Sequence, residues 1–333
     1  MENKTSKIII DFFFFVAVLV PSLVLLILES PDLPFQRGFY CDDETLRYPY
    51  RPDTISVGVL MSVGLLVPIT TMFICEWMLY RHWAEQGSSW QPYSRQKVCC
   101  YKTHPWATAL YSTIGPFLLG GGITLLLTDA GKHVIGRLRP HFMAVCEPDW
   151  SAINCTNEDD FSIYVQDIPC LGNDTDKLAN ARLSFPSGHS SSAFYVFTYW
   201  MIYMQARMIP EVFGDTLLRP FLQMVGFLMA MLVSLSRVSD YKHHWSDVLA
   251  GSLLGLAVAW LVAVYVSDLF RNPVSSQGRL ERGETLALYG SGSAMSFQSS
   301  SDGKDQSSKS GSHAQVVKAK EQTDTIITSP ALA

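Results

Sequence analysis

The chain carries six long apolar runs that are separated by polar segments. The runs are residues 8–28, 55–79, 106–128, 190–208, 221–235 and 248–270. A helix needs about 20 predominantly apolar residues to cross the hydrocarbon layer of a bilayer. Only helices and closed barrels satisfy all of their backbone hydrogen bonds there. The pattern therefore predicts an all-α, polytopic membrane protein with six transmembrane helices.

The first apolar run is preceded by Lys4 and Lys7, as the core of a signal peptide would be. The run is longer than a typical signal-peptide core, and it lacks a clear small-x-small cleavage site. These features favour a retained transmembrane helix. An even number of spans then places both ends of the chain on the same side of the membrane.

The composition changes after about residue 271. Residues 272–333 are rich in Ser, Gly, Lys and Gln and contain few large apolar side chains. Such a segment buries too little apolar surface to offset the conformational entropy that folding removes. The sequence therefore predicts a six-helix membrane domain over residues 1–271 and a disordered cytosolic C-terminal tail over residues 272–333.

Composition and charge indicate which kinds of molecule the protein binds. Hydrophobic residues make up 48% of the 333 residues, and the formal net charge is −5. A weak negative charge argues against nucleic acid as a partner, and the apolar runs indicate the lipid bilayer. Lys and Arg are distributed nearly evenly between the two sides of the predicted topology, so the positive-inside rule does not fix the orientation.

Sequons and cysteines give the orientation instead. The long loop between the third and fourth runs carries N-glycosylation sequons at Asn154 and Asn173. Four cysteines share that face of the membrane, and they are Cys41, Cys146, Cys155 and Cys170. Such a cluster is typical of an oxidising compartment, although its connectivity cannot be deduced. We therefore expect a lumenal or extracellular loop and cytosolic termini. Cys99 and Cys100 fall on the other face, as palmitoylation sites or as ordinary thiols.

Three polar segments fall at one predicted membrane face, because spans three and five run outward and spans four and six run inward. The first of these segments contains Lys132 and Arg139, which are about two helical turns apart, followed by Pro140, which ends the helix. Two cations at a helix end suit a phosphate group. The alternative is an ordinary contact with lipid headgroups.

The second polar segment opens the fourth run. A helix N-terminus presents unpaired N–H groups and a partial positive charge, so it favours anions. Ser187 is placed to donate to an oxyanion, Gly188 permits close backbone approach, and His189 is placed to protonate a leaving oxygen. The alternative is a plain helix N-cap at Ser187.

The third polar segment, residues 236–248, lies between the last two runs. His243 and Asp247 are four residues apart and would share a helix face. Asp247 would then hold one ring nitrogen of His243 and leave the other free to attack an electrophile. Arg237 is placed to bind an anion. Spacing favours His243 over His244 without settling the choice, and an ordinary polar turn is the alternative.

Taken together, the three polar segments suit an enzyme that transfers a phosphoryl group. Such an enzyme positions the phosphate and neutralises its negative charge. No carboxylate cluster or His/Cys spacing indicates a metal centre, and no cofactor is expected. The chain resembles the type 2 phosphatidic acid phosphatase superfamily in three motifs that occur in the same order. They are Lys-x6-Arg-Pro at 132–140, Pro-Ser-Gly-His at 186–189 and Ser-Arg-x5-His-x3-Asp at 236–247. Residues 34–41, Pro-Phe-Gln-Arg-Gly-Phe-Tyr-Cys, resemble the animal lipid phosphate phosphatases, and the resemblance covers about residues 1–270.

This resemblance implies a six-span core with an extracellular or lumenal site. It implies Mg-independent hydrolysis of phosphatidate, lysophosphatidate, sphingosine 1-phosphate and ceramide 1-phosphate. It assigns His243 as the nucleophile that forms a phosphohistidine, Asp247 as its orienting partner and His189 as the general acid. The residues that would bind the substrate phosphate are Lys132, Arg139, Ser187, Gly188 and Arg237. All of the motif positions are intact, which argues against a relative that has lost its activity.

Two other classes of function remain as alternatives. A non-catalytic phospholipid-binding protein would not need an intact nucleophile, orienting residue and acid. A transporter or channel would need charged residues deep within its spans, whereas Glu76 and Asp129 lie near span ends. The expected partners are membrane lipid phosphates and the bilayer, and homo-oligomerisation is left open. The expected location is the plasma membrane, with an endomembrane pool as a second location.

Overall fold

The computed structural model describes residues 4–27, 34–85, 97–98, 101–155, 163–214, 217–267 and 269–270. The predicted tail over 272–333 and the pair Cys99 and Cys100 lie outside these residues. Long helices occupy the positions of all six apolar runs. They are α1 (Lys4–Ile27), α2 (Val57–Glu85), α3 (Pro105–Ile135), α6 (Gly188–Arg207), α8 (Leu218–Ser239) and α9 (Trp245–Leu261), which continues into a π-helical turn, η2 (Val262–Val266). The prediction of a mainly helical chain is confirmed.

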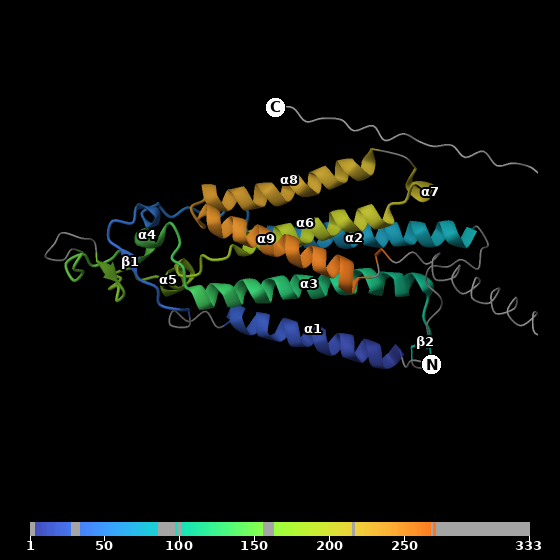
Figure 1. Cartoon of the computed structure of the whole chain (residues 1–333), viewed down its shortest axis with the longest axis horizontal. Helices are drawn as coiled ribbons and strands as arrows, with labels where there is room; N and C mark the ends of the chain where they lie inside the picture. The colour runs from blue at the N-terminus through green and yellow to red at the C-terminus, as the bar shows by residue number, and fades with distance from the viewer. Residues whose placement is uncertain are drawn as a thin grey trace, which may run out of the picture. The chain divides into compact units, whose positions relative to one another are not determined.

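Short elements gather at the two ends of the long helices (Figure 1). At one end lie η1 (Glu44–Leu46), α4 (Phe142–Cys146), α5 (Thr175–Ala181) and the antiparallel pair β1 (Phe39–Tyr40) and β4 (Tyr164–Val165). At the other end lie the start of α1, α7 (Pro210–Phe213) and the hairpin of β2 (Lys97–Val98) and β3 (Tyr101–Lys102). We call the first end the cap.

Disulfides hold the cap together. Cys41 is bonded to Cys155, and Cys146 is bonded to Cys170. The first bond joins the segment before α2 to the long loop after α3, and the second closes a turn within that loop. Disulfides are typical of an oxidising compartment. Asn154 and Asn173 are exposed in the same cap.

Six spans are only partly supported by the structure. Within the described residues, α2, α3, α8 and the helix over Trp245–Val266 are long and apolar enough to cross a membrane. Among the described residues, α1 contributes a shorter apolar segment, Ile8–Ser22, and α6 does not reach the same apolarity. The physical reason for α6 is its position. It contacts α2, α3, α8 and α9, so much of its surface faces protein instead of lipid.

A row of tyrosines fixes α6 to the helices that precede it in the chain. Tyr195, Tyr199 and Tyr203 follow one another at four-residue spacing and are almost fully buried. The hydroxyl of Tyr195 donates to the carbonyl of Phe117 over 2.6 Å. The Tyr199 hydroxyl lies 3.3 Å from the carbonyl of Thr113. Buried hydroxyls need such partners, so this row orients α6 against α3.

Two glycines let α9 approach α6 closely. A Cβ atom added to Gly251 would lie 2.5 Å from the backbone oxygen of Ser187, and one added to Gly255 would lie 2.3 Å from that of Ser191. Any larger residue would push the helices apart. This approach brings the turn before α9 against the start of α6, where two of the predicted polar segments lie.

Candidate active site

Backbone hydrogen bonds join the three polar segments at the cap end of the helices. The Ser187 N–H donates to the Asp247 carbonyl over 3.0 Å, and the Ser184 N–H donates to the Arg137 carbonyl over 3.0 Å. The Arg139 N–H donates to the Ala181 carbonyl over 2.8 Å. The expected meeting of the end of α3, the start of α6 and the α8–α9 turn is therefore confirmed.

His243 is buried, with an exposed fraction of 4%. Its Nδ1 lies 2.7 Å from the backbone carbonyl of Ser184. A carbonyl only accepts hydrogen bonds, so Nδ1 carries the proton and Nε2 keeps its lone pair. Burial, together with the positive charges of Arg139 and Lys132, holds the pKa of His243 well below its usual value. The imidazole is therefore neutral at physiological pH.

The predicted hydrogen bond between His243 and Asp247 is wrong. It assumed one helix through both residues, but α9 begins at Trp245, so His243 lies in the preceding turn. Asp247 accepts from the Ser184 hydroxyl over 2.6 Å and from the backbone N–H of His244 over 3.1 Å. Ser184 thus links the two residues, since its carbonyl holds His243 and its hydroxyl holds Asp247.

The sequence reasoning missed Arg137 and Ser184. Arg137 forms an ion pair with the fully buried Asp247 and donates to the Ser246 hydroxyl over 2.8 Å. Both missed residues lie within the polar segments that the sequence identified, but their partners are about 60 or more positions away. The only available signal for Arg137 was its position among the cations that follow α3.

Lys132 lies against the start of α6, and Arg139 lies against the segment before it. The prediction of one helix through both cations up to Pro140 is wrong, because α3 ends at Ile135 and Gly136 caps it in the left-handed conformation. The Lys132 Nζ is 2.8 Å from the Asp129 carboxylate, and a Cβ added to Gly188 would lie 3.2 Å from that Nζ. Gly188 therefore leaves the space that Lys132 uses. Arg139 places Nη2 3.4 Å from the Leu183 carbonyl, and its buried Nε has no hydrogen-bond partner. Burial lowers the pKa of Arg139 to about 10, so it stays charged at pH 7.

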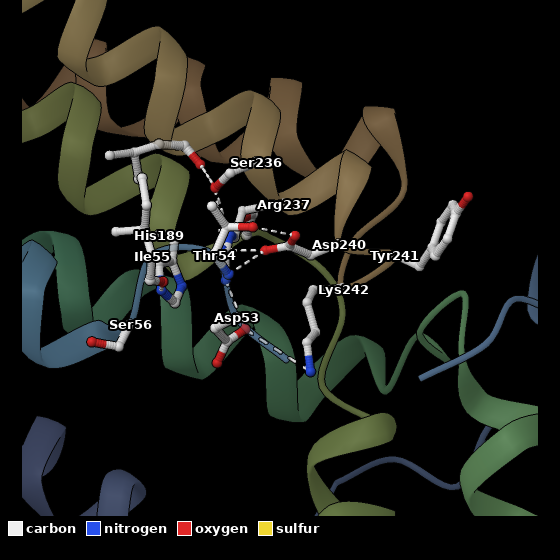
Figure 2. Close-up of polar contacts among 12 residues, drawn as sticks. Asp53, Thr54, Ile55, Ser56, His189, Ser236, Arg237, Asp240, Tyr241 and Lys242 are labelled. Carbon is white, nitrogen blue, oxygen red and sulfur yellow. Dashed lines mark hydrogen bonds and ion pairs between the residues drawn. The ribbon is translucent and has the colours of Figure 1, made fainter. Parts of the chain in front are cut away.

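Arg237 is fully buried, and carboxylates already engage it (Figure 2). Its Nη1 lies 2.9 Å from Asp53 and its Nη2 lies 2.7 Å from Asp240. Its Nε donates to the Ser236 hydroxyl over 3.2 Å. The sequence predicted Arg237 as an anion-binding residue. The structure adds that two acidic residues, neither of which the sequence reasoning singled out, hold it in place.

Ser187 directly precedes α6, and His189 lies in its first turn. The His189 Nε2 donates to the Ile55 carbonyl over 3.1 Å. Burial, and next the charge of Arg237, lowers the pKa of His189 to about 4, so the side chain is neutral at pH 7 in the anion-free site. Ser187 is the N-cap residue of α6, but its side chain makes no capping hydrogen bond. Its Oγ instead accepts from the Ser190 hydroxyl over 3.1 Å.

An apolar cavity of about 190 Å³ lies among α1, α2, α3 and α6. Its lining includes Leu125 of α3 and Ser192 of α6. Leu125 is two helical turns from Lys132, and Ser192 is one turn from Gly188. The cavity therefore lies directly below the cationic end of the site. Among the residues that the structure describes, no three His, Cys, Asp or Glu side chains converge as metal ligands would.

Comparison with known proteins shows which family this chain matches. The model described as "PAP2 superfamily" matches residues 113–271, which include all three polar segments. "Phospholipid phosphatase 1" of Mus musculus is 40% identical over 285 residues, covering 85% of this chain and 93% of the relative. "Phospholipid phosphatase 2" of Homo sapiens is 41% identical over 293 residues, covering 86% and 93%. A "Putative phosphatidate phosphatase" of Drosophila melanogaster is 42% identical over 243 residues, covering 72% of this chain and 64% of the relative. No solved structure matches.

Proposed function

The chain belongs to the phospholipid phosphatases of the PAP2 superfamily, and from this premise we propose that it hydrolyses the phosphate monoesters of membrane lipids. The substrates in this proposal are phosphatidate, lysophosphatidate, sphingosine 1-phosphate and ceramide 1-phosphate. One observation carries the proposal. A buried, neutral His243 is held at Nδ1 by the Ser184 carbonyl, beside the cations Lys132 and Arg139.

In the first step, the free Nε2 of His243 attacks phosphorus and the bond from phosphorus to the lipid oxygen breaks. The lipid oxygen takes a proton from His189 and leaves as an alcohol. Lys132, Arg139 and the N-terminus of α6 stabilise the negative charge on the phosphoryl oxygens. In the second step, water gives a proton back to His189 and attacks the phosphohistidine, which releases inorganic phosphate and restores His243.

His189 must be protonated before the first step, although it is neutral in the anion-free site. A phosphate group bound beside it supplies negative charge, which raises the pKa of the imidazole. His243 gains positive charge when it forms the phosphohistidine. The Ser184 carbonyl and the carboxylate of Asp247, which reaches this histidine through Ser184, stabilise that charge. Asp247 and Ser184 are thus positioning residues in this mechanism.

The apolar cavity supports a lipid as the substrate. It is larger than the apolar cavity of about 150 Å³ that holds a benzene molecule in an engineered lysozyme. With the phosphate at Lys132 and Gly188, an attached hydrocarbon chain would continue into the cavity one to two turns below. A water-soluble phosphate ester would leave it unused.

We further propose that α1 and α6 complete a six-span arrangement with α2, α3, α8 and α9. The cap is then extracellular or lumenal, and both termini are cytosolic, with residues 272–333 as a disordered tail. The plasma membrane is the proposed location, with an endomembrane pool. Glycans at Asn154 and Asn173 would report the orientation, because glycosidase treatment of protein from animal cells should then increase gel mobility. The double variant Asn154→Gln, Asn173→Gln should show no such shift.

The proposed activity is tested by phosphate release from phosphatidate in detergent micelles by the purified chain. Release should persist in a chelator, because Lys132 and Arg139 neutralise the charge that a metal ion would otherwise neutralise. Vanadate should inhibit, since it adopts the five-coordinate geometry of the transition state. An absolute requirement for added magnesium would contradict this mechanism.

A further inference from the structure

A short segment of the cap lies across the catalytic residues. We call residues 47–56 the strap. Three consecutive residues at its end contact three different parts of the site (Figure 2). Asp53 is paired with Arg237, the Thr54 N–H donates to Asp240 over 2.8 Å, and the Ile55 carbonyl accepts from His189 over 3.1 Å. The strap therefore contacts both the cationic residues and the proposed general acid.

The other end of the strap is fixed by aromatic contacts. The rings of Tyr48 and Tyr241 are stacked with their centroids 4.5 Å apart, and Lys242 lies 3.9 Å from the centre of the Tyr50 ring. The Tyr48 N–H also donates to the carbonyl of Pro140 over 3.1 Å. Both ends of the strap are thus held, which places Asp53 against Arg237 without help from a bound ligand.

The two carboxylates on Arg237 differ in how firmly they are held. The Asp240 side chain is 8% exposed and accepts both the N–H and the hydroxyl of Thr54, the latter over 2.6 Å. The Asp53 side chain is 42% exposed, and its second cation, Lys242, is 3.9 Å away. Asp240 is therefore a permanent partner of Arg237, and Asp53 is the partner that can leave.

A carboxylate oxygen and a phosphate oxygen make the same kind of charge-assisted hydrogen bond to a guanidinium group. We propose that Asp53 is a positioning residue that occupies, on Nη1 of Arg237, the place of a phosphate oxygen, and that the phosphate of the substrate displaces it into solvent. The inference rests on the proposed function. Between turnovers Asp53 keeps Arg237 directed towards the site, and its return helps to expel inorganic phosphate after the second step.

The test is the affinity of the full-length purified protein for inorganic phosphate, measured directly by calorimetry and as product inhibition of turnover. Asp53→Asn removes the competing charge and keeps the size of the side chain. Phosphate should then bind about tenfold more tightly, because the free site no longer has to release a competing anion. KM should fall with the phosphate inhibition constant, whereas kcat should stay level or fall as product release slows.

Two matched variants separate this effect from its alternatives. Glu44→Gln removes the same charge from the same part of the cap and should leave phosphate affinity unchanged. Asp53→Glu keeps the charge and should restore the wild-type phosphate affinity. A merely structural role of Asp53 would instead lower the unfolding temperature of Asp53→Asn and weaken phosphate binding.

The outcomes are distinguishable from failure of the proposed function. A wild-type chain that neither hydrolyses lipid phosphates nor binds inorganic phosphate overturns both proposals. A wild-type chain that turns over, with unchanged or weaker phosphate binding in Asp53→Asn, overturns only the role of Asp53. In that case Asp53 would be a fixed anchor of Arg237.

Discussion

Two arginines lie at opposite ends of the helices, one fully buried and one largely buried, and each is paired with acidic side chains from other parts of the chain. At the cap end, Arg237 of α8 contacts Asp53 and Asp240. Near the other end, Arg207 of α6 lies 3.2 Å from Glu76 of α2, which is 1% exposed and also accepts from the Tyr203 hydroxyl over 3.1 Å. Both arginines need a negative partner, because an unpaired charge inside a protein is costly.

The two sites differ in the element that carries the carboxylate. Glu76 belongs to a long helix and is enclosed, so its pair is a permanent joint between α2 and α6. Asp53 belongs to a loop, and a large part of its side chain is in contact with solvent. If Asp53 is displaced as we propose, exposure of the carboxylate, and not the type of contact, distinguishes an exchangeable ion pair from a structural one. The variants below alter one end of the molecule and leave the other intact.

The largest effect is expected from the two histidines of the cap end. His243→Ala should lose activity on every substrate, because no phosphoenzyme forms without the nucleophile. His189→Ala should lose about 10²–10⁴-fold on lysophosphatidate, whose alkoxide leaving group needs a proton. Its loss on p-nitrophenyl phosphate should be much smaller, since the aryl oxide leaves as a stable anion. Rates are compared in the same micelles under conditions where the chemical step limits turnover.

The control for this experiment is the thermal unfolding of both variants, so that activity is compared per folded molecule. His243→Ala should lose some stability, because it removes a buried side chain and its hydrogen bond to Ser184. Equal losses of His189→Ala on the two substrates would remove the general-acid assignment. Robust turnover by His243→Ala would remove the nucleophile.

The next effect is expected at the opposite end and concerns stability. Glu76→Ala removes the buried carboxylate that pairs with the largely buried side chain of Arg207, and the loss should be about 3 kcal/mol of unfolding free energy. Glu85→Ala breaks an ion pair with Arg81 on the same helix, but both side chains there are exposed, so about 0–1 kcal/mol is expected. The measurement is the denaturation midpoint in detergent, with turnover per folded molecule as the second readout. A large loss of turnover at full stability in Glu76→Ala would refute a purely structural joint.

The smallest effect is expected between the two ends, in the apolar cavity. A Cβ added to Gly121 would lie 3.6 Å from the Tyr195 ring, which is ordinary van der Waals contact. Gly121 lines the cavity, so we expect the Gly121→Leu side chain to fill part of it. If the side chain displaces about two methylene groups of a lipid, the loss is about 1.6 kcal/mol, or roughly a tenfold increase in KM for long-chain phosphatidate.

Gly115→Leu on the same helix is the matched control, because nothing lies within 4 Å of its added Cβ and it is not part of the cavity. Short-chain substrates should be nearly unaffected by either variant. Equal KM values for long-chain phosphatidate in both variants would show that the lipid chain does not enter the cavity.

Much of the fold was predictable because apolar runs report helices directly. The run over 8–28 corresponds to α1 at Lys4–Ile27, and the run over 190–208 corresponds to α6 at Gly188–Arg207. Differences arise at the ends, where polar residues continue a helix beyond its apolar part, as α2 does up to Glu85. Hydrophobic patterning detects the apolar surface of a helix and does not detect its polar last turn.

The residues of the site could be predicted from the sequence where they lie close together in the chain. Contacts between residues that are far apart in the chain could not be predicted. The polar segments were found, because each is local. Asp53 and Arg237 are 184 positions apart, and the cysteine pair Cys41 and Cys155 is 114 apart. No local spacing encodes contacts of that kind. The error over Asp247 had a different cause, since a helical spacing was applied to His243, which lies in a turn.

The tyrosine row of α6 has a consequence for biosynthesis. In the proposed six-span arrangement, α6 leaves the ribosome before α8 and α9, so it enters the membrane before two of the helices that cover it are made. The carbonyl and carboxylate groups that accept from its tyrosine hydroxyls, by contrast, belong to helices that are already present, namely α3 for Tyr195 and Tyr199 and α2 for Tyr203. The additional contact of Tyr199 with Ser267 forms later. The least apolar long helix can therefore pack against α2 and α3 as soon as it is synthesised. The order in which the helices are synthesised then matches the order in which they pack.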